Sequence, residues 1–250
     1  MRSKVKILAC LAVMACFLVG LSGNVYAEEM KHKHGGSADM HMHHLHTLMT
    51  HGLAMVAEGS NMVMLAEMKM APSVDPMTLE HGRHMIKSGK EVIEHALNGP
   101  EMKGLHKEGH AEDPLMKYTH QLGEAMMNAV SILEKMSMEG PMAADMMTMH
   151  HMHMMINHAL AMAAEGSNMA MLGQMGMAKD VDKYSAEHGT MMMKDAHALL
   201  TEVMGGKAMT EMHEKGMKME NAMMAETHKL GEAAAKVIDL LEKMPAAGSK

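Results

Sequence analysis

The chain contains the same unit twice, and this duplication constrains its fold more than any other feature. The hexapeptide AEGSNM occurs at 57–62 and again at 164–169, an offset of 107 residues. After one inserted residue in the second copy, the register resumes at an offset of 108 and holds to the Leu-Glu-Lys-Met that ends each copy. A repeat of this kind predicts two units of the same fold, which we place at 39–140 and 141–244. Each is of single-domain size, and the repeat leaves open whether the two units share one core.

Each unit has the composition and the boundary signals of helices. The first segment is rich in Met, Leu and Ala, which favour helices. The second begins with Asp75-Pro76, an N-cap followed by proline at the first helical position, and ends at Asn98-Gly99. Strand signals are essentially absent. We therefore predict an all-α protein of two tandem antiparallel helical bundles, each a unit of three to four helices. In the first unit the predicted helices cover about 40–58 (or on to 69), 75–98, 101–110 and 113–136.

The first 27 residues have the form of a secretory signal peptide. Basic residues precede an apolar run from Ile7 to Leu21, and Val25-Tyr26-Ala27 gives a small-residue cleavage pattern. The apolar run is too short to span a membrane. We expect cleavage after Ala27, which would make the protein periplasmic or secreted, with no membrane attachment afterwards. A polar, His-containing tail would then occupy 28–38, and a short C-terminal tail would occupy 245–250.

Cleavage at this point would remove every cysteine from the chain. Both cysteines and the single Phe lie before residue 28, whereas all 21 His and nearly all of the 42 Met lie after it. A chain without cysteine forms no disulfide scaffold and offers no thiolate ligand. Soft-metal chemistry would therefore depend on thioether and imidazole groups. The net charge of −7 and the scarcity of aromatic residues also argue against nucleic-acid binding.

Histidine and methionine recur one helical turn apart. His51 and Met55 form such a pair, and so do His81 and Met85 on the next predicted helix. An i, i+4 spacing places two donors on one face of a helix. Unrolled at about 100° per residue, this face lies beside the apolar side of the helix. The predicted metal ligands are His44, His51, Met55, His81 and Met85 in the first unit, and His151, His158, Met162, His188 and Met192 in the second.

Other histidines fall on different faces. His43 and His46, with their equivalents in the second unit, point away from the face that carries His51. His120 and His228 lie opposite the apolar side of their helix, so we expect them to face solvent. Most of the 21 histidines nevertheless recur at equivalent positions in the two units. Core filling does not explain that recurrence, although it can explain the methionines, which adapt to irregular gaps.

The donor types select the class of metal. Thioether together with imidazole suits Cu(I) and, by the same argument, Ag(I), whereas imidazole alone also suits Cu(II), Zn or Ni. The sequence therefore predicts binding, buffering or sequestration of Cu(I) or Ag(I), with Cu(II) as a further option, at sites between the first two helices of each unit. One alternative is a metal-free, chaperone-like interaction protein whose Met-rich faces bind partner helices or hydrophobic clients. Another is a pool of methionines that oxidants consume.

An enzyme is not expected. A di-iron bundle needs Glu-x-x-His pairs on facing helices, and that spacing occurs only in the predicted tail. The sequence has no Cys-x-x-Cys-His haem motif and no His-Glu-x-x-His zinc motif.

The second unit also contains the pattern Met152-x-x-Met155-Ile156-x-His158, followed by Ala-x-Met162. This pattern resembles the opening helix of a family of exported, Met/His-rich helical-bundle proteins of the ferritin-like four-helix type, implicated in copper binding and resistance. The family usually has two adjacent histidines after its Met-Ile, whereas here Ala159 takes the second place. The match covers about a dozen residues in each copy. The resemblance implies copper handling in the periplasm, where a copper exporter or oxidase would be the expected partner.

Overall fold

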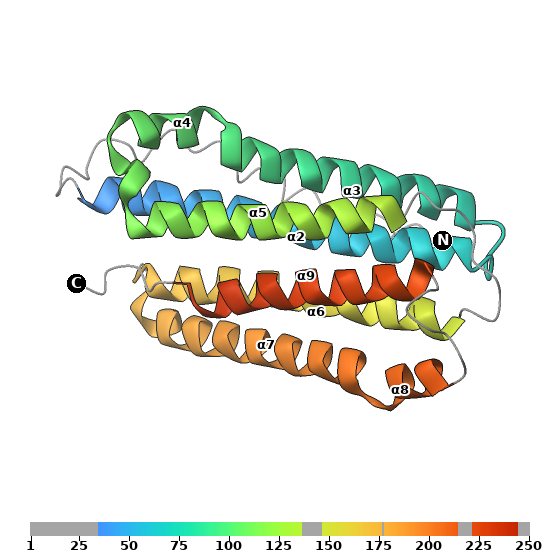
Figure 1. Ribbon diagram of the computed structural model, residues 1–250. Coiled ribbons are helices and arrows are strands. Elements are labelled where there is room, and N and C mark those ends of the chain that lie inside the picture. The colour runs from blue at the N-terminus through green and yellow to red at the C-terminus, as the bar shows by residue number, and fades with distance from the viewer. Residues whose placement is uncertain (1–34, 137–146, 177, 215–221, 245–250) are drawn as a thin grey trace, which may run out of the picture. The chain divides into compact units, whose positions relative to one another are not determined.

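The computed structural model (Figure 1) describes residues 35–136, 147–176, 178–214 and 222–244. These residues form helices and no strand, so the all-α prediction is confirmed. None of the described helices has the length and apolar content needed to span a membrane. The predicted signal peptide, residues 28–34 of the predicted polar tail and the C-terminal tail lie outside the described residues. The prediction of a tail as far as residue 38 is wrong for residues 35–38, which already form the start of the first described helix.

The α-helices described in the two repeats follow one another in the same order. In the first repeat the elements are α2 (Gly35–Glu67), α3 (Asp75–Asn98), α4 (Pro100–Lys107), the 3-10 turn η1 (His110–Glu112) and α5 (Pro114–Met136). In the second they are α6 (Met147–Gln174), α7 (Lys179–Gly205), α8 (Lys207–Glu214) and α9 (Ala222–Glu242). The predicted boundaries of the second and fourth helices of the first repeat agree with α3 and α5 to within about a residue.

The helices of both repeats surround one core within the compact unit that begins at Ala38. The long helices α5 and α9 pack against each other, and α7 packs on α6 and α9 (Figure 1). Because the chain has so few aromatic residues, Met, Leu and Ala fill the space between them. The fully buried side chains include Met49, Leu53, Met126, Met149 and Leu160. The two repeats therefore share one core, a point that the sequence left open, since one continuous cluster of buried residues joins them.

Two polar contacts join α2 to α6 and are related by the repeat. The Asn157 amide donates a hydrogen bond to Asn61 Oδ1 at 2.9 Å, and the Thr50 hydroxyl lies 2.5 Å from Asn168 Oδ1. Asn61 is equivalent to Asn168, and Thr50 is equivalent to Asn157. The two helices therefore run antiparallel, and the two contacts exchange places when the repeats are exchanged.

Glycine allows close contact between the first two helices of each repeat. A Cβ placed on Gly59 of α2 would lie 2.6 Å from the carbonyl oxygen of Gly82 of α3, and one on Gly166 of α6 would lie 2.7 Å from that of Gly189 of α7. Real side chains do not fit at such distances, so these positions require glycine. Gly52, two turns before Gly59 on α2, faces Gly89 in the same way. We call this contact between α2 and α3 the first glycine seam, and that between α6 and α7 the second.

Candidate metal-binding sites

The first glycine seam brings two predicted thioether ligands to the same level. Met55 lies three residues after Gly52, and Met85 lies four residues before Gly89, which faces Gly52 across the antiparallel seam. The Cβ of Met55 is 3.1 Å from a Cβ placed on Gly89, and that of Met85 is 2.9 Å from one placed on Gly59. Both methionines are half-buried. They therefore flank the seam from opposite helices and remain in reach of solvent.

A histidine lies one turn away from each of these methionines. His51 precedes Met55 on α2, and His81 precedes Met85 on α3. Because the helices are antiparallel, the two histidines lie on opposite sides of the methionine pair along the seam. Both histidines are exposed. We call these four residues the first Met–His row. At about 1.5 Å per residue it spans roughly 14 Å, so a single ion cannot contact all four.

The second glycine seam repeats this arrangement. Met162 lies four residues before Gly166 and Met192 three after Gly189, and these two glycines face each other. Met162 and Met192 are half-buried and stand at the same level, flanked by His158 and His188, which complete the second Met–His row. His188 is half-buried, and its ring stacks on Tyr184 with the centroids 5.6 Å apart. His158 is exposed.

Two of the ten predicted ligands lie apart from the rows. His44 precedes His51 by two turns, and His151 precedes His158 by the same distance, roughly 10 Å along the helix axis. Both side chains are exposed. The structure thus groups eight of the predicted residues into two equivalent rows and leaves His44 and His151 outside them.

The histidines that the helical projection placed on other faces of α2 and α6 are buried. The His46 Nε2 is 2.6 Å from the hydroxyl of Thr119, which itself donates to a backbone carbonyl, so His46 donates and Thr119 accepts. His153 makes the equivalent contact with Thr227. Burial, with a smaller effect of the neighbouring His43 and His150, lowers the pKa of His46 to about 4 and that of His153 to about 3. Both imidazoles are therefore neutral near pH 7 and form a polar part of the core.

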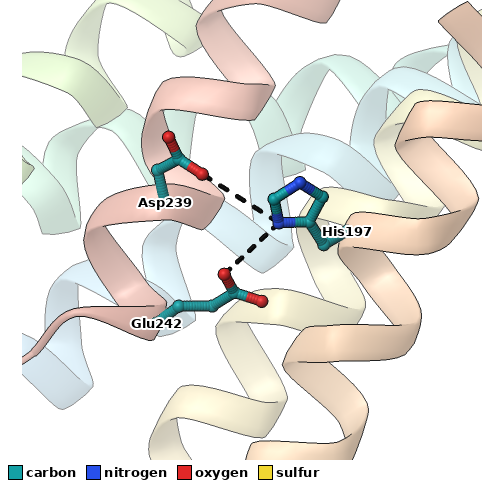
Figure 2. A group of neighbouring side chains, drawn as sticks. All are labelled: His197, Asp239 and Glu242. Atoms are coloured by element: carbon teal, nitrogen blue, oxygen red, sulfur yellow. Dashed lines mark hydrogen bonds and ion pairs between the residues drawn. The ribbon is translucent and has the colours of Figure 1, made fainter.

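A third group was not predicted from the sequence. Figure 2 shows His197 of α7 pointing toward Asp239 and Glu242 of α9. The His197 Nδ1 lies 3.3 Å from a carboxylate oxygen of Glu242 and 4.0 Å from one of Asp239. Within the described residues, this is the one group of three or more His, Cys, Asp or Glu with donor atoms within 4.8 Å of one another. Its side chains are exposed or half-exposed. The i, i+3 spacing of the two carboxylates was the available sequence signal, but their partner comes from another helix.

The first repeat has an ion pair where the second has this group. Lys90 of α3 is equivalent to His197, and Glu134 of α5 is equivalent to Glu242. The Lys90 ammonium lies 2.7 Å from the Glu134 carboxylate. Each repeat thus joins its second long helix to its last by a polar contact at the same position. We interpret the His197 group as such a contact rather than as a metal site.

The sequence led us to expect that His120 and His228 face solvent. In the structure each of them contacts another histidine instead. His120 is half-buried and its Nε2 lies 3.0 Å from that of His106, while the Nε2 of His228 lies 3.3 Å from that of His213. Their partners come from the short helices α4 and α8, whose placement a helical projection of α5 and α9 does not contain.

No family model, curated protein or solved structure matches this chain. A proposal for the function must therefore rest on the fold and the two Met–His rows. The resemblance to exported copper-binding helical-bundle proteins stays a prediction.

Proposed function

We propose that the protein binds Cu(I) or Ag(I) at the two Met–His rows and so buffers or sequesters the metal. The observation that carries this proposal is the placement of Met55 and Met85 at one level on facing helices, repeated by Met162 and Met192. Two thioethers with an imidazole close by form a donor set that soft monovalent ions favour.

The glycine seams support the proposal because they fix the separation of the helices that carry the donors. At Gly59 and Gly82 the backbones are in contact, so the two helices cannot approach further. The positions of the methionine Cβ atoms are therefore set by the fold before any metal binds. Preorganised ligands lose less conformational entropy on binding than ligands on flexible loops. The half-exposed methionines also leave an entry path from solvent.

The length of each Met–His row limits how its four donors can share metal ions. Each row contains one methionine pair, and a histidine lies one turn to either side. One ion can bind both thioethers and one of the two histidines, and the second histidine then offers a neighbouring position. We therefore expect at least two Cu(I) per chain, one in each repeat.

The proposed location follows from the predicted signal peptide. Cleavage after Ala27 would deliver the protein to the periplasm or the exterior, where a copper exporter or oxidase is the proposed partner. We propose metal binding rather than catalysis, because the donors are chemically suited to holding an ion and the sequence contains no recognisable catalytic motif.

The decisive experiment is a Cu(I) titration of the purified protein against a chromophoric competitor under anaerobic conditions. The test variant replaces the four row methionines by leucine, which keeps apolar bulk but removes the sulfur. The control replaces the same number of exposed methionines. The substitutions are Met55→Leu, Met85→Leu, Met162→Leu and Met192→Leu in the test variant, and Met40→Leu, Met70→Leu, Met77→Leu and Met147→Leu in the control.

We expect the test variant to lose two tightly bound Cu(I) per chain and the control to keep them. Unchanged stoichiometry and affinity in a folded test variant would overturn the proposal. Elemental analysis of protein purified from copper-supplemented cells gives an independent check.

A second candidate function rests on exposed apolar residues at the turns between α2 and α3 and between α6 and α7. These residues occur at equivalent positions in the two repeats, which favours a binding surface for a partner protein. They are Leu65, Val74 and Met77 in the first repeat, and Leu172, Val181 and Tyr184 in the second, with exposed fractions between 45% and 69%. This metal-free interaction function would be favoured if protein from copper-supplemented cells contained no metal.

A further inference from the structure

Each repeat carries a pair of histidines with adjacent ring nitrogens, away from the Met–His rows. His106 of α4 and His120 of α5 form the first pair, with an Nε2–Nε2 distance of 3.0 Å. His213 of α8 and His228 of α9 form the second, at 3.3 Å. The pairs are equivalent under the repeat. The same geometry thus occurs twice, although the inserted residue of the second repeat lies between its two histidines.

The distances match two ligands of one metal ion. Imidazole nitrogens bind Zn²⁺ at about 2.0–2.1 Å. Two such nitrogens are about 3.3 Å apart at a tetrahedral angle and about 2.9 Å apart at a right angle, whereas a linear two-coordinate ion would hold them about 4 Å apart. The observed 3.0 and 3.3 Å lie within the range for adjacent ligands. This spacing favours a divalent ion with higher coordination number over linear Cu(I).

A carboxylate lies one turn beyond the second histidine of each pair. Glu124 follows His120 by four residues on α5, and Glu232 follows His228 by four on α9. Both glutamates are exposed. An i, i+4 spacing places each carboxylate on the same helix face as its histidine. In the structure its oxygens do not lie within 4.8 Å of both imidazoles, so the glutamate side chain must turn to reach an ion bound by the pair. The set of two imidazoles and a carboxylate is one that zinc sites use with water at the remaining position.

The two rings of a pair can meet through a metal ion or through a direct hydrogen bond. A neutral imidazole is the form that binds a metal. Without a metal, one ring can donate an N–H to the other, which also accounts for the short distance. A metal site and a hydrogen-bonded pair therefore differ in what happens when an ion is supplied.

We propose that each histidine pair binds one divalent transition metal ion of borderline softness, such as Zn²⁺, and that the glutamate one turn beyond the pair turns toward the bound ion as a third ligand. This function is additional to the Cu(I) sites, because it uses other residues, other helices and another class of ion. Metal binding would also link the short helix α4 to α5 and the short helix α8 to α9.

Calorimetric titration of the purified protein with Zn²⁺ tests the proposal. The variant His106→Gln/His213→Gln removes one ligand from each pair, and the matched control His41→Gln/His84→Gln removes two exposed histidines elsewhere. We expect the pair variant to bind two fewer Zn²⁺ per chain than the control, and a His106→Gln variant to bind one fewer. Zn²⁺ should also raise the unfolding temperature of the control but raise that of the pair variant less.

Equal Zn²⁺ stoichiometry and affinity in the pair variant and the control would overturn the proposal and leave two hydrogen-bonded histidine pairs. The variant His120→Gln/His228→Gln repeats the test from the other ring, and circular dichroism establishes that each variant folds. The leucine variant of the Met–His rows should keep these two Zn²⁺ ions. Failure of the zinc sites and failure of the Cu(I) sites are therefore separately observable.

Discussion

Lys90 and His197 stand at the same position in the two repeats, and each pairs with the equivalent glutamate of the last long helix, Glu134 or Glu242. The contact recurs in the two repeats at the same position but with different chemistry, since an ammonium group stands in one repeat where an imidazole stands in the other. A structural contact between helices can use either lysine or histidine at this position, whereas a metal site would need the histidine.

The variant His197→Lys is therefore expected to keep the Zn²⁺ stoichiometry of the unchanged protein. It should change the free energy of unfolding at pH 7 by less than about 1 kcal/mol, because exposed ion pairs contribute little. Zinc titration and urea denaturation measure the two quantities. Loss of one bound Zn²⁺ would instead identify His197, Asp239 and Glu242 as a metal site.

The first glycine seam should tolerate no added methyl group. Gly59→Ala would place a Cβ 2.6 Å from the Gly82 carbonyl oxygen, so the helices must separate. We expect a loss of about 1–3 kcal/mol in the free energy of unfolding, as for other overpacked contacts. We also expect weaker Cu(I) binding in the first repeat alone, because the methionine pair moves apart.

Gly104→Ala is the matched control for this substitution. Gly104 also lies within a helix, α4, but a Cβ there has no neighbour within 4 Å. Alanine should stabilise the protein at this position by about 0.5–1 kcal/mol, since glycine is the poorer helix former. Urea denaturation of both variants separates the effect of the close contact from that of glycine itself. Similar losses at both positions would contradict the interpretation of the seam.

The buried histidines should make the protein less stable in mild acid. The folded-state pKa is about 4 for His46 and about 3 for His153, below the ordinary value of 6.5. Between those values and pH 6.5 the unfolded chain binds more protons, so stability is full above pH 6.5 and falls as the pH decreases. The loss is at most about 1.4 kcal/mol per pH unit for each histidine. Urea denaturation at pH 7 and pH 5 measures it.

The variant His46→Gln/His153→Gln is the control for the pH effect, because a glutamine amide can donate to Thr119 or Thr227 without titrating. Its stability should fall less between pH 7 and pH 5. Glu67 titrates with the opposite sign, since burial raises its pKa to about 7, but it is present in both proteins. Equal slopes in the two proteins would show that the histidines are not the origin of the acid sensitivity.

The contact between Asn61 and Asn157 should contribute to joining the repeats. Asn157→Ala removes the donor to Asn61 and leaves a partly buried polar group without it. We expect a loss of about 1–3 kcal/mol in the free energy of unfolding. The exposed Asn128→Ala should change stability by less than about 0.5 kcal/mol. A single urea transition is expected for all these proteins, because the repeats share one core.

The sequence predicted the helical class and the limits of α3 and α5 because those features depend on local signals such as Asp75-Pro76 and Asn98-Gly99. The burial of His46 was not predicted. A helical projection gives the direction of a side chain from its own axis, but not which helix lies in that direction. Helix α2 contacts α3 through Gly59 and contacts α5 through His46, so it is covered on more than one side.

The histidine pairs could not be predicted from a helical projection for the same reason. His106 and His120 come from different helices, and their approach depends on how α4 folds back on α5. No periodicity within either helix contains that information. The glycine seam is an intermediate case, since the spacing of seven between Gly52 and Gly59 and between Gly82 and Gly89 was visible in the sequence. Only the structure shows that these glycines face one another.

The reciprocal contacts between α2 and α6 have a consequence for how such a chain can arise. Asn61 and Thr50 of one repeat meet the equivalents of Thr50 and Asn61 in the other, so one unit alone already carries both partners of the interface. Such a surface is self-complementary, and two identical half-length chains would associate through it about a two-fold axis. The present chain is, in this respect, equivalent to a symmetric dimer whose two subunits are covalently joined and differ at positions such as Lys90 and His197.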